Sequence, residues 1–189
     1  MNRNFLLVLS LFMFLTLTPC NAQSNKKLCC GHKPDPAAIE LNNQAINAYT
    51  NRANSPDSVK KAMTLLDCAI EKDPDYQIAY AHKAEYLKNQ GDIAQALETL
   101  NAYLKRNPTE PYTLLDAGIF YEKLGNKKEA MDYYKRAEEN FKRLYEEEHE
   151  SPLEINRYFA IILMEGPKKA KALYEAERDR LASDEERRK

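Results

Sequence analysis

The fold is decided by residues 77–110, QIAYAHKAEYLKNQGDIAQALETLNAYLKRNPTE, and by residues 111–137, PYTLLDAGIFYEKLGNKKEAMDYYKRA, which share one pattern. Alanines recur at a constant step, as Ala62, Ala96 and Ala130, and a large apolar residue follows each of them four positions later. A constant step of this length is typical of stacked helix-turn-helix units, each of which buries its apolar face against its neighbour. The sequence therefore predicts an all-α stack.

Glycine and proline mark the ends of the predicted helices. Gly91 and Gly125 each offer a helix stop inside a unit, whereas Pro74 and Pro108 close units. Connections of two to five residues place consecutive helices antiparallel and adjacent. We therefore expect each unit to be a helical hairpin.

The pattern resembles that of tetratricopeptide repeat (TPR) proteins, which have large, small and aromatic residues in one 34-residue frame. The resemblance implies a TPR-type α-solenoid of antiparallel helix pairs, with about three clear repeats between residues 40 and 142. The first repeat, about Asn43 to Tyr76, keeps Ala62, Leu66, Ala69 and Pro74. The next two match in more positions, namely Tyr80, Ala84, Leu87, Gly91, Ala96, Leu100 and Pro108, and then Leu114, Gly118, Tyr121, Gly125, Ala130, Tyr134 and Ala137.

The repeat step is interrupted after Ala137. Gly166 lies seven residues farther from Gly125 than Gly125 lies from Gly91. Seven residues are about two helical turns, so one longer helix, from about Asn126 to Glu150, absorbs them. A degenerate C-terminal helix pair is expected to follow, with apolar residues at Ile155, Phe159, Ile162, Ala170, Leu173 and Tyr174.

The first helix of each pair lines a concave groove in TPR proteins, so the resemblance implies a peptide or protein partner there. The groove positions in this sequence are Asn47, Asn51, Ile78, Ala81, Glu85, Tyr112, Leu115, Ile119 and Lys123. Tyr112, Leu115 and Ile119 form a second apolar stripe on their helix. This stripe either packs against the fourth helix pair or contacts a partner.

One TPR subgroup binds C-terminal carboxylates through lysine, arginine and asparagine side chains on its first helices. At the matching positions this chain has Asn51, which fits, but also Asn47, His82, Tyr112 and Asp116, which do not. A single asparagine cannot replace the lost charge-assisted hydrogen bonds. Binding of chaperone C-termini is therefore disfavoured.

The N-terminus has the pattern of an export signal. Arg3 precedes a largely apolar run, 5–18, which is too short for a comfortable membrane span. Two processing outcomes compete, cleavage after Ala22 or lipidation of Cys20 as in bacterial lipoproteins, and an uncleaved signal is the third outcome left open. We expect a signal in residues 1–22, or ending before Cys20, then a linker over 23–36, a TPR domain over 37–182 and a charged tail over 183–189.

The cysteines of an exported chain meet an oxidising compartment. A disulfide between Cys68 and either Cys29 or Cys30 would fasten the linker to the first repeat. The alternative is a redox or metal module that uses Cys29, Cys30 and Cys68, but CCGH lacks the two-residue gap of CxxC motifs. No metal or cofactor is expected.

The remaining composition excludes several classes of function. The chain has 28 basic and 29 acidic residues, so no basic field is available for nucleic acid. The sequence contains no HExxH, no GxSxG and no glycine-rich phosphate loop. We therefore expect an exported, non-enzymatic adaptor or scaffold of the periplasm or cell envelope, which contacts the membrane only if Cys20 carries a lipid anchor.

Overall fold

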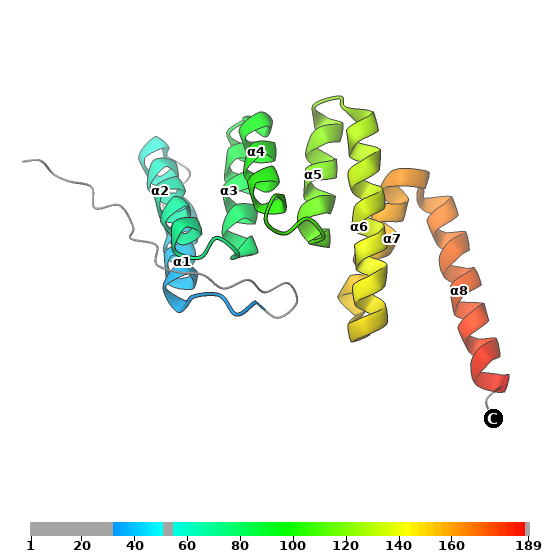
Figure 1. Cartoon of the computed structure of the whole chain (residues 1–189). Helices are drawn as coiled ribbons and strands as arrows, with labels where there is room; N and C mark the ends of the chain where they lie inside the picture. The colour runs from blue at the N-terminus through cyan, green and yellow to red at the C-terminus, as the bar shows by residue number, and fades with distance from the viewer. Residues whose placement is uncertain (1–31, 51–54, 188–189) are drawn as a thin grey trace, which may run out of the picture.

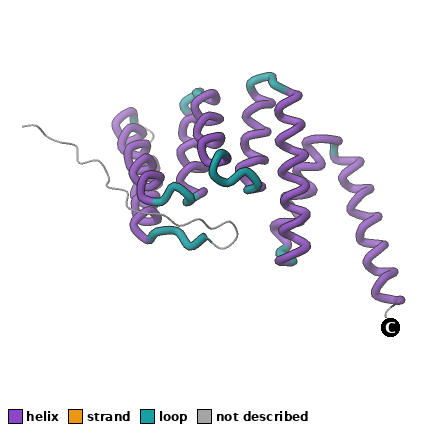
Figure 2. The backbone as a smooth tube through the Cα atoms, in the orientation of Figure 1, coloured by secondary structure: helices purple, strands orange, loops and turns teal. Residues whose placement is uncertain are grey.

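The computed structural model describes residues 32–50 and 55–187, and this part of the chain consists of eight α-helices without a β-strand (Figures 1 and 2). The prediction of an all-α fold is confirmed. The helices are α1 (Pro36–Thr50), α2 (Pro56–Lys72), α3 (Gln77–Asn89), α4 (Ile93–Leu104), α5 (Pro111–Lys123), α6 (Lys127–Glu148), α7 (Ser151–Glu165) and α8 (Pro167–Arg187).

The helices form four hairpins that stand side by side in chain order, α1 with α2 through to α7 with α8 (Figure 1). Each helix packs against the next one along the chain. The hairpins are stacked in one direction, so the molecule is an extended solenoid rather than a closed bundle.

Local capping explains where several helices begin. The Ser55 side chain accepts a hydrogen bond from the backbone N–H of Ser58 at 3.3 Å, and Pro56 occupies the first turn of α2. Asp92 caps α4 in the same way, accepting from the N–H of Gln95 at 3.0 Å. These caps satisfy N–H groups that have no partner inside the helix.

Two glycines let the first helix of a pair turn into the second. Gly91 and Gly125 are separated by one repeat step and lie just beyond α3 and α5, with φ angles of +85° and +83°. Most other residues are strained in this left-handed region, so glycine is favoured there. The step in the sequence thus corresponds to a repeated backbone geometry.

The core follows the alanines of the repeat. Ala62, Ala96 and Ala130 are all buried on the second helices of their pairs. Buried apolar residues form two clusters, one over α1 to α3 and a larger one over α3 to α7. Small residues at the repeat positions allow close helix contacts, and larger side chains such as Leu100 and Tyr134 fill the space beside them.

The first helix differs from the prediction. The buried residues Ala38 and Ala45 of α1 occupy the positions that Ala79 and Tyr86 occupy on α3. The repeat step would instead align Ala45 with Ala79, so the two helices are seven residues farther apart in the sequence than one repeat step. The frame that begins the first repeat at Asn43 is therefore wrong for its first helix. The second helices do keep the step, because the additional residues precede α2.

The C-terminal part contains the two longest helices. Helix α6 has 22 residues, against 12 in α4, and so accommodates the additional residues that follow Ala137. Helix α8 has 21 residues and continues through 183–187, the first part of the charged segment. None of the helices described has both the length and the apolar character needed to cross a membrane.

Candidate partner-binding site

The odd-numbered helices after α1 present the same side to the core. Buried residues occur at matching places on α3, α5 and α7: Ala79, Thr113 and Leu153, and seven residues later Tyr86, Phe120 and Ala160. Helix α5 follows α3 by one repeat step, and α7 follows α5 by six residues more than that step. Since the buried positions of α3, α5 and α7 coincide in this alignment, the positions that face away from the core coincide as well.

The surface that these helices turn away from the core is named here the odd-helix face. It consists of Ile78, His82 and Glu85 on α3, then Tyr112, Asp116 and Ile119 on α5, and then Asn156 and Phe159 on α7. The odd-helix face is polar on α3, where His82 and Glu85 lie. It is apolar on α5 and α7, where Ile119 and Phe159 occupy the positions that correspond to Glu85. A partner lying across this face would contact a polar part and an apolar part.

Most of the residues predicted for the groove are accessible. Ile78 is 47% exposed and Tyr112 is 38% exposed. Glu85 and Lys123 are also exposed, whereas Ala81 and Ile119 are half-buried. Asn51 lies outside the described residues.

Asn47 is exposed on α1, but its place in the helix is not the predicted one. The observed alignment of α1 with α3 matches Asn47 to Lys88 rather than to Ala81. The residue of α1 that meets the odd-helix face is Asn42. Its amide oxygen accepts a hydrogen bond of 2.8 Å from Nδ1 of His82 on α3.

Leu115 belongs to the core. It is only 5% exposed and is part of the large cluster that also contains Leu153 and Ala160 of α7. Of the two interpretations of the apolar stripe, packing inside the stack therefore holds for Leu115. Tyr112 meets Phe141 of α6 edge-on, with 4.9 Å between ring centroids, yet keeps part of its ring at the surface.

Asp116 is the most unusual group of the odd-helix face. Its carboxyl forms no hydrogen bond or ion pair within the described part of the chain. Burial raises its pKa to about 6, the negative charges of Glu110 and Glu85 act in the same direction, and Lys88 acts against them. A half-buried carboxyl without a partner attracts a cation or a hydrogen-bond donor.

The neighbours of Asp116 are already engaged. Glu110 caps α5 by accepting from the N–H groups of Tyr112 at 3.2 Å and Thr113 at 2.6 Å. Glu85 forms an ion pair with Lys88 on the same helix. Burial raises the pKa of Glu110 in spite of its hydrogen bonds. This part of the surface is therefore electronegative, and Lys88, the cation beside it, is already paired with Glu85.

His82 has a structural role. Burial lowers its pKa, and its Nδ1–H is used in the bond to Asn42 that joins α1 to α3. A second polar link joins α3 to α5, where the Gln77 amide donates to the Thr113 hydroxyl at 3.3 Å. These links fix the spacing of the helices that form the odd-helix face.

Sequence reasoning missed the contribution of α7. Phe159 occupies the place that Ile119 has on α5, and its ring is exposed. The predicted groove ended at Lys123 because the regular repeat frame ends before α7. The sequence does contain a signal for this helix, namely the helical spacing of the apolar residues Ile155, Phe159 and Ile162.

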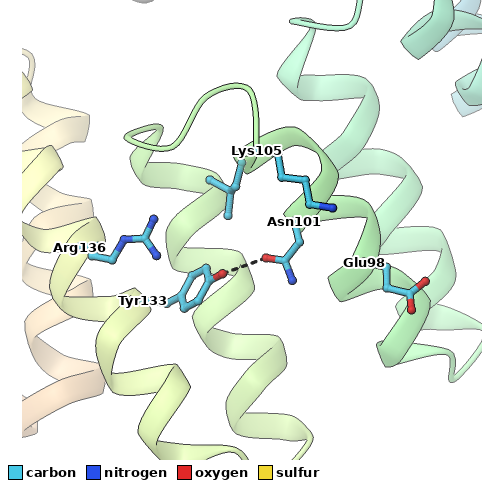
Figure 3. Close-up of a pocket in the computed structure, with 6 residues that line it drawn as sticks. Glu98, Asn101, Lys105, Tyr133 and Arg136 are labelled. Atoms are coloured by element: carbon cyan, nitrogen blue, oxygen red, sulfur yellow. Dashed lines mark hydrogen bonds between the residues drawn. The ribbon is translucent and has the colours of Figure 1, made fainter.

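A different concavity lies between α4 and α6, on the side of the even-numbered helices. It has a volume of about 660 Å³. In Figure 3, Tyr133 and Asn101 point toward each other, and the Tyr133 hydroxyl donates to the Asn101 amide oxygen at 3.0 Å. Arg136 lies over the Tyr133 ring and donates to the carbonyl of Pro108. These polar groups bind one another, so the odd-helix face is the stronger candidate.

The cysteine predictions concern residues that are mostly undescribed. Cys68 is half-buried on α2, whereas Cys20, Cys29 and Cys30 lie outside the described residues. The residues that the structure describes contain no group of three His, Cys, Asp or Glu side chains placed to hold a metal. The disulfide, the lipid anchor and the redox or metal module stay predictions.

Together, the stacked hairpins and the exposed odd-helix face define an α-solenoid with a surface suited to binding. The family model described as "Psidin, N-terminal TPR repeats region" matches residues 54–173. The chain belongs to this tetratricopeptide repeat family. No curated protein matches the sequence.

Solved structures show the same fold at low sequence identity. The Yersinia enterocolitica type III secretion translocator chaperone SycD is 13% identical with a TM-score of 0.55, over 69% of this chain and 89% of SycD. PcrH, in complex with the chaperone binding region of PopD, is 14% identical with a TM-score of 0.53, over 72% of this chain and 92% of PcrH. MamA is 20% identical with a TM-score of 0.50, over 58% of this chain and 61% of MamA. The chain therefore spans less than two thirds of the length of MamA.

Proposed function

We propose that the protein is an adaptor without enzymatic activity that binds a segment of a partner protein on the odd-helix face. The observation that carries this proposal is Asp116, a half-buried carboxyl that has no partner in the described chain and lies between the helices of Ile78 and Phe159. The family supports the proposal, and so does the PcrH structure, which contains a bound region of PopD.

The odd-helix face fits a partner segment that combines one cationic side chain with apolar side chains. The cation faces Asp116, Glu85 and Glu110, where it relieves the mutual repulsion of the acids. The apolar side chains cover Ile119 and Phe159. The contact with Asp116 gives specificity, and the apolar contacts give most of the affinity.

Short fluorescent peptides that pair one lysine with two apolar residues test this proposal by fluorescence anisotropy. A peptide with glutamate in place of the lysine is the control ligand. We expect the lysine peptide to bind at least about tenfold more tightly, a factor that corresponds to about 1.4 kcal/mol. The variants Asp116→Asn and Phe159→Ser should weaken its binding, whereas Glu129→Gln, at an exposed site on α6, should not. Equal binding of both peptides, or no binding of either, would contradict the proposal.

We also propose that the chain is exported to the cell envelope. The support is the apolar run 5–18 after Arg3. Mass spectrometry of the mature protein tests this proposal. A chain that begins at Gln23 indicates cleavage, a lipid on Cys20 indicates an anchor, and an intact Met1 contradicts both processing routes.

A further inference from the structure

The last helix pair carries an excess of exposed apolar side chains. Eleven large apolar side chains are exposed in the described chain, and six of them lie on α7 and α8. They are Ile155, Phe159, Ile162, Leu173, Tyr174 and Leu181. Surfaces of this kind on a soluble domain mark sites of interaction.

Leu115 of the preceding helix pair shows how a residue at the position of Ile155 packs inside the stack. Ile155 corresponds to Leu115, because Leu153 of α7 takes the place of Thr113 of α5. Leu115 is 5% exposed within the core cluster that includes α7, whereas Ile155 is 66% exposed. Ile155, with Ile162 two helical turns later on the same side of α7, therefore forms a stacking surface that the described chain leaves partly exposed.

Helix α8 extends this stacking surface and is fixed in place. Tyr174 meets Tyr158 of α7 nearly at a right angle, with 5.4 Å between ring centroids. Arg157 donates to both carboxylate oxygens of Glu177, at 2.8 and 3.0 Å. Leu173 instead lines a cleft of about 400 Å³ that is formed by α6, α7 and α8. We name four of the remaining exposed apolar residues the terminal face: Ile155, Ile162, Tyr174 and Leu181. Phe159 stays part of the odd-helix face.

The charge pattern of α8 indicates what covers the terminal face. Residues 167–174 contain three lysines and no acid, whereas residues 175–187 contain six acids and three arginines. The two parts therefore carry formal charges of +3 and −3. Two α8 helices that lie antiparallel place the basic part of each beside the acidic part of the other. A two-fold axis between two copies produces this arrangement.

We propose that two copies of the chain associate through their terminal faces about a two-fold axis, with their α8 helices antiparallel. The apolar residues of each copy take the place of the helix pair that is missing from the stack of the other. The lysines near Pro167 and the acids Glu175 and Asp179 fix the relative orientation of the copies. This interface is separate from the contact with Asp116, so the odd-helix face of α3 and α5 stays accessible in the dimer.

Sedimentation equilibrium of the mature full-length chain tests the proposal. We expect a monomer–dimer equilibrium, and the variant Ile155→Glu should raise the dissociation constant at least tenfold. Met131→Glu is the matched control, because Met131 is exposed on α6 outside the terminal face. Circular dichroism should show both variants folded, since both sites are exposed. A monomer at every concentration, or equal effects of the two variants, would overturn the proposal.

Charge reversal tests the antiparallel arrangement. Replacing Lys168, Lys169 and Lys171 with glutamate should weaken the homodimer, and so should replacing Glu175 and Asp179 with lysine. A mixture of the two variants should form a heterodimer more tightly than either forms a homodimer. Failure of the mixture to recover association would overturn the antiparallel arrangement, even where the wild-type chain is a dimer. Glu177 is left unchanged, because it binds Arg157.

Discussion

The third and fourth helix pairs are built from similar repeats but are stabilised differently. In α5 and α6, Leu114, Tyr134 and Phe141 are almost completely buried, and apolar packing holds the pair together. In α7 and α8, the central contact is the Arg157 guanidinium, which binds Glu138 at 2.8 Å and also Glu177. The third pair thus uses its apolar residues in its own core, whereas the fourth leaves several of them exposed for other contacts.

The largest expected difference between these pairs is in the effect of truncating one apolar side chain. Leu114→Ala should lower the free energy of unfolding by about 2–5 kcal/mol, because it opens a cavity in a close-packed core. Ile155→Ala should change it by less than about 0.5 kcal/mol, since Ile155 is exposed. Urea unfolding below the association range measures both. Similar losses for the two variants would remove the distinction between the pairs.

Removal of the Arg157 charge tests how α8 is attached. Arg157→Met should cost about 3 kcal/mol, because Glu138 and Glu177 are then left near the core without their cation. Hydrogen exchange should become faster in α8 and stay unchanged in α3 and α4. Lys135→Met is the control, since Lys135 forms only an exposed pair with Glu139. If α8 kept its protection in Arg157→Met, apolar contacts alone would hold it.

A methyl group at Gly118 probes the close contact inside the third pair. A Cβ atom there would lie 2.6 Å from two ring carbons of Tyr134, which is far too close. Gly118→Ala should therefore destabilise the fold by about 1–3 kcal/mol. Combination with Tyr134→Leu should recover part of this loss, and a double-mutant cycle in thermal unfolding measures the coupling. Strict additivity would mean that the two residues do not compete for space.

The smallest expected effect is a gain in stability at Asp116. Its folded pKa of about 6 lies above the ordinary 3.8, so its contribution to stability decreases as the pH rises between these values. Asp116→Asn should therefore stabilise the chain by about 1–2 kcal/mol at pH 8, and the gain should disappear near pH 4. Thermal unfolding across this range measures it. A stability gain that did not vary with pH would indicate that burial of the ionised Asp116 carboxylate does not destabilise the fold.

The repeat step was sufficient to predict the stack, its helix ends and the longer α6. It failed for α1, because residues inserted before α2 shift the first helix without altering the alanines of the second helices. A repeated alanine indicates a close contact between helices at its own position. It carries no information about where the preceding helix begins.

The sequence also left the site incomplete. Helix α5 is apolar on two sides, and periodicity cannot distinguish a side covered by the next pair, as at Leu115, from one that is exposed, as at Tyr112. The raised pKa of Asp116 depends on its burial and on the charges of Glu85 and Lys88 on another helix, α3, so no local pattern indicates it. Phe159 was missed because its helix begins six residues later than the repeat step places it.

Hydrogen–deuterium exchange of the wild-type chain at a low and a high protein concentration tests most directly whether the two regions differ as described. The account predicts slow exchange in α3 to α6 at both concentrations, because their own packing protects them. It predicts that α7 and α8 gain additional protection at the high concentration, where two terminal faces meet. Protection of α7 and α8 that is independent of concentration and equal to that of α5 and α6 would contradict the account.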